Sequence, residues 1–262
     1  MDLGISGKRA LVLGGNRGIG LGIARALVQE GVHVAIAARD AQRLEAASAE
    51  LSALGPGKAA GFALDLGEPD GLAAFVEHLT QAFGPIDILV NNTGGPEYGG
   101  ASGRGTTAWR DSFEQMVMSV IALTDAVLPG MRARQWGRVL TVVSSGVVQP
   151  IPVLGISNSL RGALLGWSKT LSTEVAADGV TVNVLVPGRI DTERVRLTDE
   201  AVAEREGISV EEARRRSTGI IPLQRYGKVE EFAAVAAFIA SERASYVTGS
   251  MVRCDGGIIR SV

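Results

Sequence analysis

The chain has 262 residues, of which 46% are hydrophobic and 21% are charged, and its formal net charge is −2. This length suffices for one globular core, and the near-neutral charge excludes a broad basic surface for nucleic acid. The single cysteine, Cys254, excludes an internal disulfide framework. The N-terminus does not resemble a signal peptide, and no apolar run reaches membrane-spanning length. We therefore expect a soluble cytoplasmic protein that interacts with neither nucleic acid nor a membrane.

Short runs rich in Val, Ile and Leu alternate with longer amphipathic stretches along the whole chain. The short runs predict strands near residues 9–13, 32–38, 60–65, 86–90, 138–143, 180–186 and 250–254. The amphipathic stretches predict helices near residues 18–30, 41–54, 69–83, 107–134, 156–177 and 229–240. This alternation is typical of a parallel sheet covered by helices on both faces. No linker or repeat interrupts it, so residues 1–262 are predicted to form one doubly wound α/β (Rossmann) domain with roughly seven strands.

A glycine-rich turn follows the first predicted strand and leads into the first predicted helix. Gly14, Gly18 and Gly20 have the spacing G-x-x-x-G-x-G. Glycines let the backbone turn tightly and approach a pyrophosphate, and a helix N-terminus offers that anion unpaired N–H groups. Strand, turn and helix in this order predict a nucleotide-phosphate site. The alternative is a sharp turn that only packs.

The second predicted strand ends at Ala38 and is followed by Arg39 and Asp40. At this point a dinucleotide fold contacts the adenosine ribose: an acidic residue accepts from a 2′-hydroxyl, whereas an arginine accommodates a 2′-phosphate. Asp40 directly precedes a predicted helix, where aspartate is a good N-cap. We therefore predict that Asp40 caps the helix and that Arg39 contacts a phosphate, with Arg17 as a second phosphate ligand. This favours NADP, with NAD as the alternative; each arginine can instead be a solvated surface charge.

Two predicted irregular segments, residues 94–106 and residues 191–219, follow the carboxyl ends of strands. Open α/β sheets bind ligands at these ends. The first segment is rich in glycine and carries Glu97 and Tyr98. The second is long and polar, and its charge run at residues 211–216 is typical of either a solvated helix face or a mobile lid. Both segments are expected to shape a substrate site, but neither identifies the substrate.

An ordered set of short motifs extends over nearly the whole chain. Besides Gly14 to Gly20, the set comprises Asp65-Leu66, Asn91-Asn92-Thr93-Gly94, Ser144, Asn183, Pro187-Gly188 with Ile190 and Thr192, and Asp255-Gly256-Gly257. In this layout the chain resembles a classical short-chain dehydrogenase/reductase, closest to the 3-oxoacyl-acyl-carrier-protein reductase-like branch. The resemblance implies an NAD(P)-dependent oxidoreductase for a small carbonyl or alcohol substrate. It also implies a homo-oligomer, usually a tetramer built through the two long helices at residues 107–134 and 156–177.

The resemblance further implies a cofactor site assembled from several turns. It assigns the pyrophosphate and ribose to Gly14, Asn16, Arg17, Gly18, Ile19 and Gly20. It assigns the surroundings of the adenine to Asp65 and Leu66, the groove to Asn92 and Gly94, and the nicotinamide end to Pro187, Gly188, Ile190 and Thr192.

The family's proton relay is where this chain departs from the resemblance. The relay uses a Ser, a Tyr thirteen residues later, a Lys four residues beyond the Tyr, and an Asn on the preceding long helix. Ser144 matches the Ser, but Ser157 stands at the Tyr position, Arg161 at the Lys position and Met116 at the Asn position. The segment aligns without gaps, so a register error does not explain the change.

These replacements change the available acid–base chemistry. A Tyr hydroxyl, with a pKa of about 10, can be tuned toward neutrality, whereas a Ser hydroxyl is a poor acid–base group without a partner base. Arg161 is permanently protonated and cannot shuttle a proton. Ser157 and Arg161 share one helix face. Two interpretations of this pair stay open: it forms a site for an oxyanion or a ribose, or it only fixes the helix against a bound cofactor. Tyr98 is the best-placed substitute acid.

Two functions remain in competition at this stage. The first is a divergent NADP-dependent oxidoreductase in which Ser144, Ser157 and Arg161 polarise the carbonyl, and water or Tyr98 supplies the proton. The second is a nucleotide-binding protein with little or no turnover, acting as a sensor or partner subunit. His33 and His78 lie in predicted elements and are interpreted as structural. Neither a metal-spaced cluster nor a G-x-S-x-G elbow is present, so a metalloenzyme and a hydrolase are disfavoured.

Overall fold

The computed structural model describes all residues 1–262 and contains one seven-stranded sheet, in which every pair of neighbouring strands is parallel. The strand order is β3-β2-β1-β4-β5-β6-β7. The strands are β1 (Arg9–Leu13), β2 (His33–Ala38), β3 (Ala59–Ala63), β4 (Ile88–Asn91), β5 (Gly137–Val142), β6 (Val180–Pro187) and β7 (Met251–Cys254). The chain order reverses between β1 and β4, which is the topological switch point of a doubly wound fold. The predicted fold class is confirmed.

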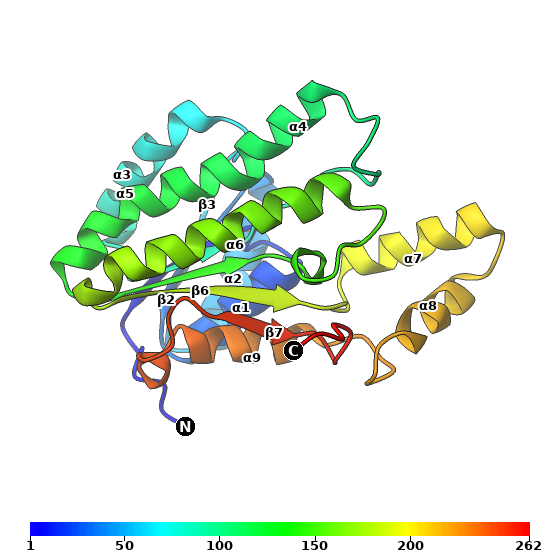
Figure 1. The fold of residues 1–262 in the computed structure, drawn as a ribbon. Coiled ribbons are helices and arrows are strands. Elements are labelled where there is room, and N and C mark those ends of the chain that lie inside the picture. Colours follow the sequence, from blue (N-terminus) through cyan, green and yellow to red (C-terminus); the bar gives the residue numbers. More distant parts are fainter.

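Helices cover both faces of this sheet (Figure 1). One face packs against α1 (Gly18–Gln29), α2 (Ala41–Leu54) and α9 (Val229–Ile239). The other packs against α3 (Leu72–Phe83), α5 (Ser119–Ala133) and α6 (Gly155–Val175). Because both faces are covered, the central strands β1 and β4 consist almost entirely of buried apolar residues, which explains why they read as continuous hydrophobic runs.

The helix predicted at residues 107–134 is continuous but not uniform. It comprises α4 (Thr106–Phe113), a π-helical turn at Glu114–Met118, and α5. By length and composition alone its 28 residues could cross a membrane, which corrects the expectation that no stretch would qualify. Half of its most apolar window is buried within the molecule, where α5 packs on the sheet and α3. That burial is typical of a core helix.

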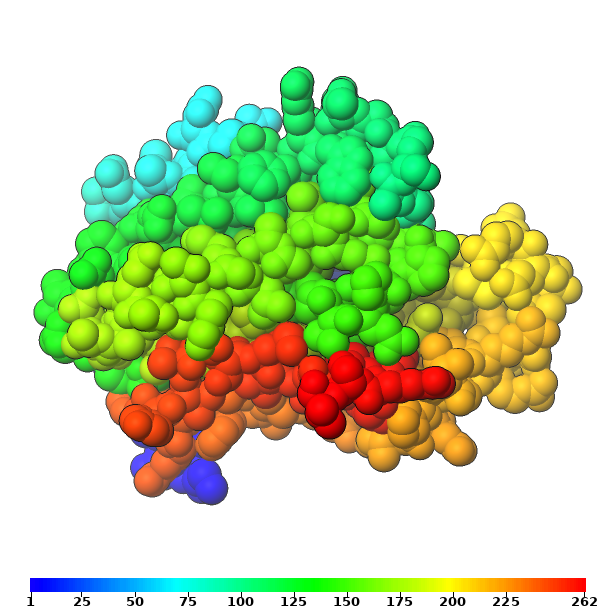
Figure 2. Space-filling model, in the orientation of Figure 1, coloured from blue at the N-terminus to red at the C-terminus, as the bar shows by residue number.

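The segment predicted to be irregular at residues 191–219 is mostly helical. It forms α7 (Glu193–Glu206) and α8 (Val210–Gly219), which project from the body beyond the carboxyl ends of the strands (Figures 1 and 2). Gly207 ends α7 in the left-handed conformation, with φ +64°, and Ser209 caps α8 by accepting from the backbone N–H of Glu212 at 3.1 Å. The irregular prediction was wrong because these helices bury few residues and so lack an apolar stripe.

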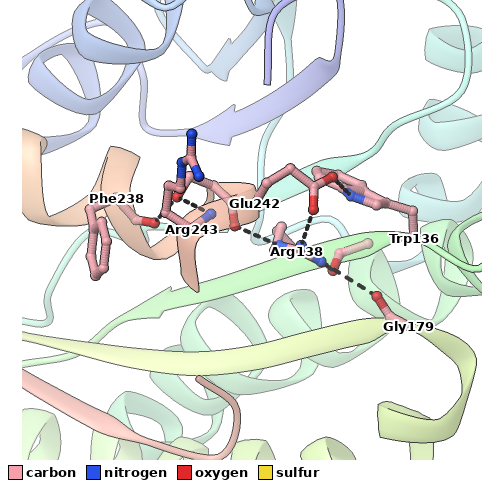
Figure 3. A network of polar contacts seen from close by, with 8 residues as sticks. Trp136, Arg138, Gly179, Phe238, Glu242 and Arg243 are labelled. Carbon is pink, nitrogen blue, oxygen red and sulfur yellow. Dashed lines mark hydrogen bonds and ion pairs between the residues drawn. The ribbon is translucent and has the colours of Figure 1, made fainter. Parts of the chain in front are cut away.

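A buried arginine organises the opposite, amino-terminal edge of the sheet. Arg138 of β5 is 2% exposed. Its guanidinium donates to the carbonyl oxygens of Gly137, Gly179 and Ser241 at 2.9, 3.4 and 3.3 Å. It also lies 4.3 Å from the ring centroid of Trp136, whose indole N–H donates to Glu242 (Figure 3). One side chain thus connects β5 to the turn before β6 and the turn after α9.

We predict that Arg138→Ala lowers the free energy of unfolding by about 2–4 kcal/mol, because three carbonyl groups lose a buried donor and a cavity remains. Urea denaturation followed by circular dichroism measures the change. Arg260→Ala, at an exposed position near the C-terminus, is the control and should stay within about 0.5 kcal/mol of the parent. Equal midpoints for the two variants would contradict the structural role of Arg138.

Candidate functional site

The glycine turn between β1 and α1 is a place where backbone segments approach closely. Gly14 and Gly18 adopt left-handed conformations, with φ +59° and +55°. A Cβ on Gly20 would overlap the carbonyl oxygen of Gly14, and one on Gly14 would lie 2.9 Å from Nδ2 of Asn92. That Asn92 amide donates to the carbonyl oxygen of Leu13 at 3.1 Å, which fixes the turn to the end of β4. No side chain caps the start of α1, so its first N–H groups are available to an anion.

Beside this turn, at the carboxyl end of β2, lies a group of arginines. Asp40 accepts from the backbone N–H of Arg43 at 3.0 Å, so the predicted N-cap of α2 is confirmed. Arg39 is exposed and makes no hydrogen bond or ion pair with the chain. Arg17 and Arg43 both pair with Glu193 of α7, at 3.2 and 3.5 Å. The hydrogen bond from Arg17 and the charge of Arg43 lower the pKa of Glu193.

Sequence reasoning missed Arg43 and Glu193 at this place. Arg43 looks like an ordinary solvated residue of α2, and Glu193 lies 176 residues away from the Arg17 with which it pairs. Only the convergence of the strand ends brings the two together.

The remaining predicted cofactor residues lie on turns that follow the carboxyl ends of the strands. Asp65, just after β3, accepts from the backbone N–H of Gly67 at 2.9 Å, and Leu66 is half-buried. Gly94, shortly after β4, is exposed. After β6, Ile190 is buried and forms an isolated bridge with Gly227. The other predicted residues in this region are Asn16, before α1, and Ile19, in its first turn; Pro187, which ends β6; and Gly188 and Thr192, between β6 and α7.

The two serines lie at the same edge of the sheet, on turns around β5 and α6. Ser144, shortly after β5, accepts from the backbone N–H of Gly146 at 3.2 Å. Ser157, in the first turn of α6, is 5% exposed, and its hydroxyl makes no hydrogen bond with the chain. The adjacent Asn158 has a buried side-chain oxygen without a partner. Polar groups at the start of α6 are therefore left available.

Arg161 of α6 reaches back under the ends of β4 and β5. It is 7% exposed and donates to the carbonyl oxygen of Val142 at 2.9 Å and to those of Thr93 and Gly94, both at 3.2 Å. No carboxylate lies within ion-pair distance. Burial, reinforced by the charge of Arg194, lowers the pKa of Arg161 to about 10, so the guanidinium remains charged at neutral pH. Its side chain connects three elements of the site.

Tyr98 points to α7. It is 45% exposed, and its hydroxyl lies 2.5 Å from Oγ1 of Thr198. Because Thr198 donates to the carbonyl oxygen of Arg194 at 2.8 Å, Tyr98 is the donor to Thr198. The Tyr98 proton is therefore engaged with α7 and not with Ser144 or Ser157.

Three other side chains considered in the sequence lie in structural positions. Met116 is 1% exposed and sits in the π-helical turn, packed in the core. His33 accepts from the backbone N–H of Lys58 at 3.1 Å, and His78 lies edge-on to Phe62. The contact of His33 supports its structural interpretation, whereas His78 is exposed on α3 and its structural role stays a prediction.

Known proteins resemble the chain over its whole length. The family model described as "Enoyl-(Acyl carrier protein) reductase" matches residues 14–259. The 3-oxoacyl-[acyl-carrier-protein] reductase FabG of Salmonella typhimurium is 35% identical over 259 residues, covering 98% of this chain and 99% of that protein. "Dehydrogenase/reductase SDR family member 4" of Bos taurus is 34% identical over 254 residues, covering 97% and 88%.

Solved structures agree with these sequence matches. L-sorbose reductase from Gluconobacter frateurii, complexed with NADPH and L-sorbose, has a TM-score of 0.95 and 35% identity over 100% of both chains. Actinorhodin polyketide ketoreductase with NADPH has a TM-score of 0.91 and 31% identity, covering 97% of this chain and 98% of that one. The chain therefore belongs to the classical short-chain dehydrogenase/reductase family, NAD(P)-dependent oxidoreductases that act on carbonyl or alcohol substrates.

Proposed function

We propose that this oxidoreductase prefers NADP(H) and exchanges a hydride with a small carbonyl or alcohol compound at a site that lacks the usual Tyr–Lys relay. The cofactor preference rests on Arg39, which directly follows β2 and has no ion-pair partner. The end of β2 itself carries no acidic residue that would accept from a 2′-hydroxyl. Ala38 ends β2, and Asp40 is occupied as the cap of α2. The relatives complexed with NADPH are consistent with this preference.

The residues of the glycine turn fit a dinucleotide. A Cβ at Gly14 would collide with Asn92, and one at Gly20 with the backbone of Gly14, so only glycines allow a turn this tight. The uncapped start of α1 next to it offers N–H donors to an anion. Arg17 and Arg39 would hold the 2′-phosphate, Asp65 and Leu66 would flank the adenine, and Ile190 and Thr192 would lie at the nicotinamide end. When bound, the cofactor supplies the hydride chemistry, and the chain positions and polarises the substrate.

We predict that the chain binds NADPH about ten- to a hundredfold more tightly than NADH, because a charge-assisted contact to phosphate is worth about 1.5–3 kcal/mol. Fluorescence titration of the two reduced cofactors measures this ratio. Arg39→Asp should erase or reverse the preference, since a carboxylate repels the 2′-phosphate and accepts from a 2′-hydroxyl.

Arg260→Asp makes the same charge change at an exposed position near the C-terminus and should leave the ratio unchanged. Equal affinity of the parent protein for NADPH and NADH would refute the proposed preference.

The substrate oxygen would be held by Ser144 and Ser157, whose hydroxyls lie at the carboxyl edge of the sheet, with the positive charge of Arg161 beneath them. None of these groups supplies a proton at neutral pH as readily as a phenol of tuned pKa. Tyr98 is engaged with Thr198, so water is the favoured proton source. Turnover with ordinary ketones is therefore expected to be slow.

We predict that restoring the relay raises turnover. Ser157→Tyr with Arg161→Lys returns a phenol and an ammonium group to one face of α6, and Met116→Asn adds the amide on the long helix. General acid catalysis is worth about 10² to 10⁴ in rate, so NADPH oxidation across a panel of ketones should increase measurably. Circular dichroism and NADPH titration verify folding and cofactor binding first.

Ser157→Phe with Arg161→Lys is the matched control, because it adds the ring without the hydroxyl and should gain nothing. In the parent protein, Tyr98→Phe tests the alternative acid and should change kcat little. If the triple variant folds and binds NADPH yet reduces no ketone, the competing hypothesis of a nucleotide-binding protein without turnover becomes the better one.

Three further properties belong to this proposal. The α7–α8 segment would act as a lid, since Glu193 contacts Arg17 of the glycine turn and Thr198 contacts Tyr98. The protein would assemble as a homotetramer through the long helix of α4 and α5 together with α6, where Phe113 and Met118 are exposed apolar residues. It would function in the cytoplasm.

A further inference from the structure

One arginine of α7 differs from its neighbours in having no acidic partner. Arg196 pairs with Glu200 at 3.6 Å, and Arg205 pairs with Glu206 at 2.9 Å. Arg194 pairs with no carboxylate. Its guanidinium lies against Gly95, where an added Cβ would come within 2.7 Å of Nη2 of Arg194. The same guanidinium is 5.7 Å from the ring centroid of Tyr98. The glycine thus leaves space for this side chain between α7 and the loop that follows β4.

A second unpaired cation lies under the same loop. Arg161 donates to the carbonyl oxygens of Thr93 and Gly94, immediately before the Gly95 that Arg194 touches. The two guanidinium groups are close enough for Arg194 to disfavour the charge on Arg161. The hydroxyl of Thr93, whose side chain is more than nine-tenths buried, has no hydrogen-bond partner. The two arginines therefore lack an anionic partner and the Thr93 hydroxyl lacks a hydrogen-bond partner, and a ligand can supply both.

No carboxylate of the chain neutralises this pair of arginines. On the loop, Glu97 is 3.5 Å from Arg104. On and before α7, Asp191 pairs with Arg214 at 2.6 Å, and Asp199 accepts from the hydroxyl of Tyr226. Glu193 is occupied by Arg17 and Arg43. Arg161 is buried, and holding its charge without an anion is costly, whereas Arg194 is exposed and can be reached by a ligand. The arrangement therefore favours an anion that arrives with a ligand.

We infer that Arg194, above the positive charge of Arg161, binds an anionic substituent of the substrate, so that the substrates are carbonyl or alcohol compounds that carry a carboxylate. The planar guanidinium matches a carboxylate with two parallel N–H···O bonds. Arg194 lies against Gly95 of the loop after β4, and the same loop is held by Arg161, which follows Ser157 by one turn of α6. Arg161 acts beneath the loop as a positioning residue. This inference rests on the proposed function and specifies its substrate class.

Binding to the NADPH-loaded protein tests the inference. The probes are 2-, 3- and 4-oxo carboxylates, each compared with its neutral methyl ester, and affinity is measured by the change in fluorescence of bound NADPH. We expect at least one carboxylate to bind about ten- to a hundredfold more tightly than its ester. Arg194→Gln should abolish that difference and leave the affinity for NADPH unchanged. Arg196→Gln, on the same helix, is the matched control and should alter neither quantity.

Three results would overturn the inference. The first is equal affinity for the carboxylates and their esters. The second is preferential binding of an oxo phosphate ester, such as dihydroxyacetone phosphate, over every carboxylate. The third is weakened NADPH binding in Arg194→Gln, which would assign Arg194 to the cofactor phosphates. If NADPH does not bind at all, the proposed function fails instead. The same probes are then titrated into the free protein by calorimetry, where loss of carboxylate binding in Arg194→Gln supports the anion site and its retention refutes it.

Discussion

The arrangement of the site depends on one buried guanidinium. Arg161 extends from α6 to the ends of β4 and β5 and saturates three backbone carbonyl oxygens there. This contact fixes the loop that begins at Thr93 relative to the start of α6, and with it the separation between that loop and Ser157. A lysine at this position would offer a single ammonium group in place of the planar fork. The arginine thus forms a rigid connection among three elements of the site.

The same edge of the sheet concentrates positive charge in a chain whose formal net charge is −2. The end of the site proposed for adenosine carries Arg17, Arg39 and Arg43. The end proposed for the substrate carries Arg161 and Arg194. Glu193 bridges Arg17 and Arg43, whereas no carboxylate pairs with Arg161 or Arg194. An edge with this distribution of charge suits a dinucleotide phosphate together with a substrate of negative charge, because fixed cations raise the local concentration of anionic ligands.

The two halves of the site differ in how well the sequence predicts them. Gly14 and Gly20 are required by backbone contacts within one strand–turn–helix unit, and Asp40 caps the helix that it precedes, so local pattern suffices for both. The helix α7 was not predicted, and α8 was anticipated only as one interpretation of the charge run at residues 211–216, because both stand outside the core and show no apolar periodicity. Tyr98 illustrates the same limit: the sequence puts it on a loop near the sheet edge, but its contact with Thr198 joins segments a hundred residues apart.

The sequence by itself determined the fold class, the positions of the strands, the glycine turn after β1 and the presence of Ser157 and Arg161 at fixed spacing from Ser144. These features depend on short-range periodicity and on residue identity at fixed spacing. Only the tertiary structure decided which charges have partners. The partner of a charged side chain is set by which strand ends and helices meet in space, and neither the burial of Arg161 nor the isolation of Arg194 can be read from neighbouring residues.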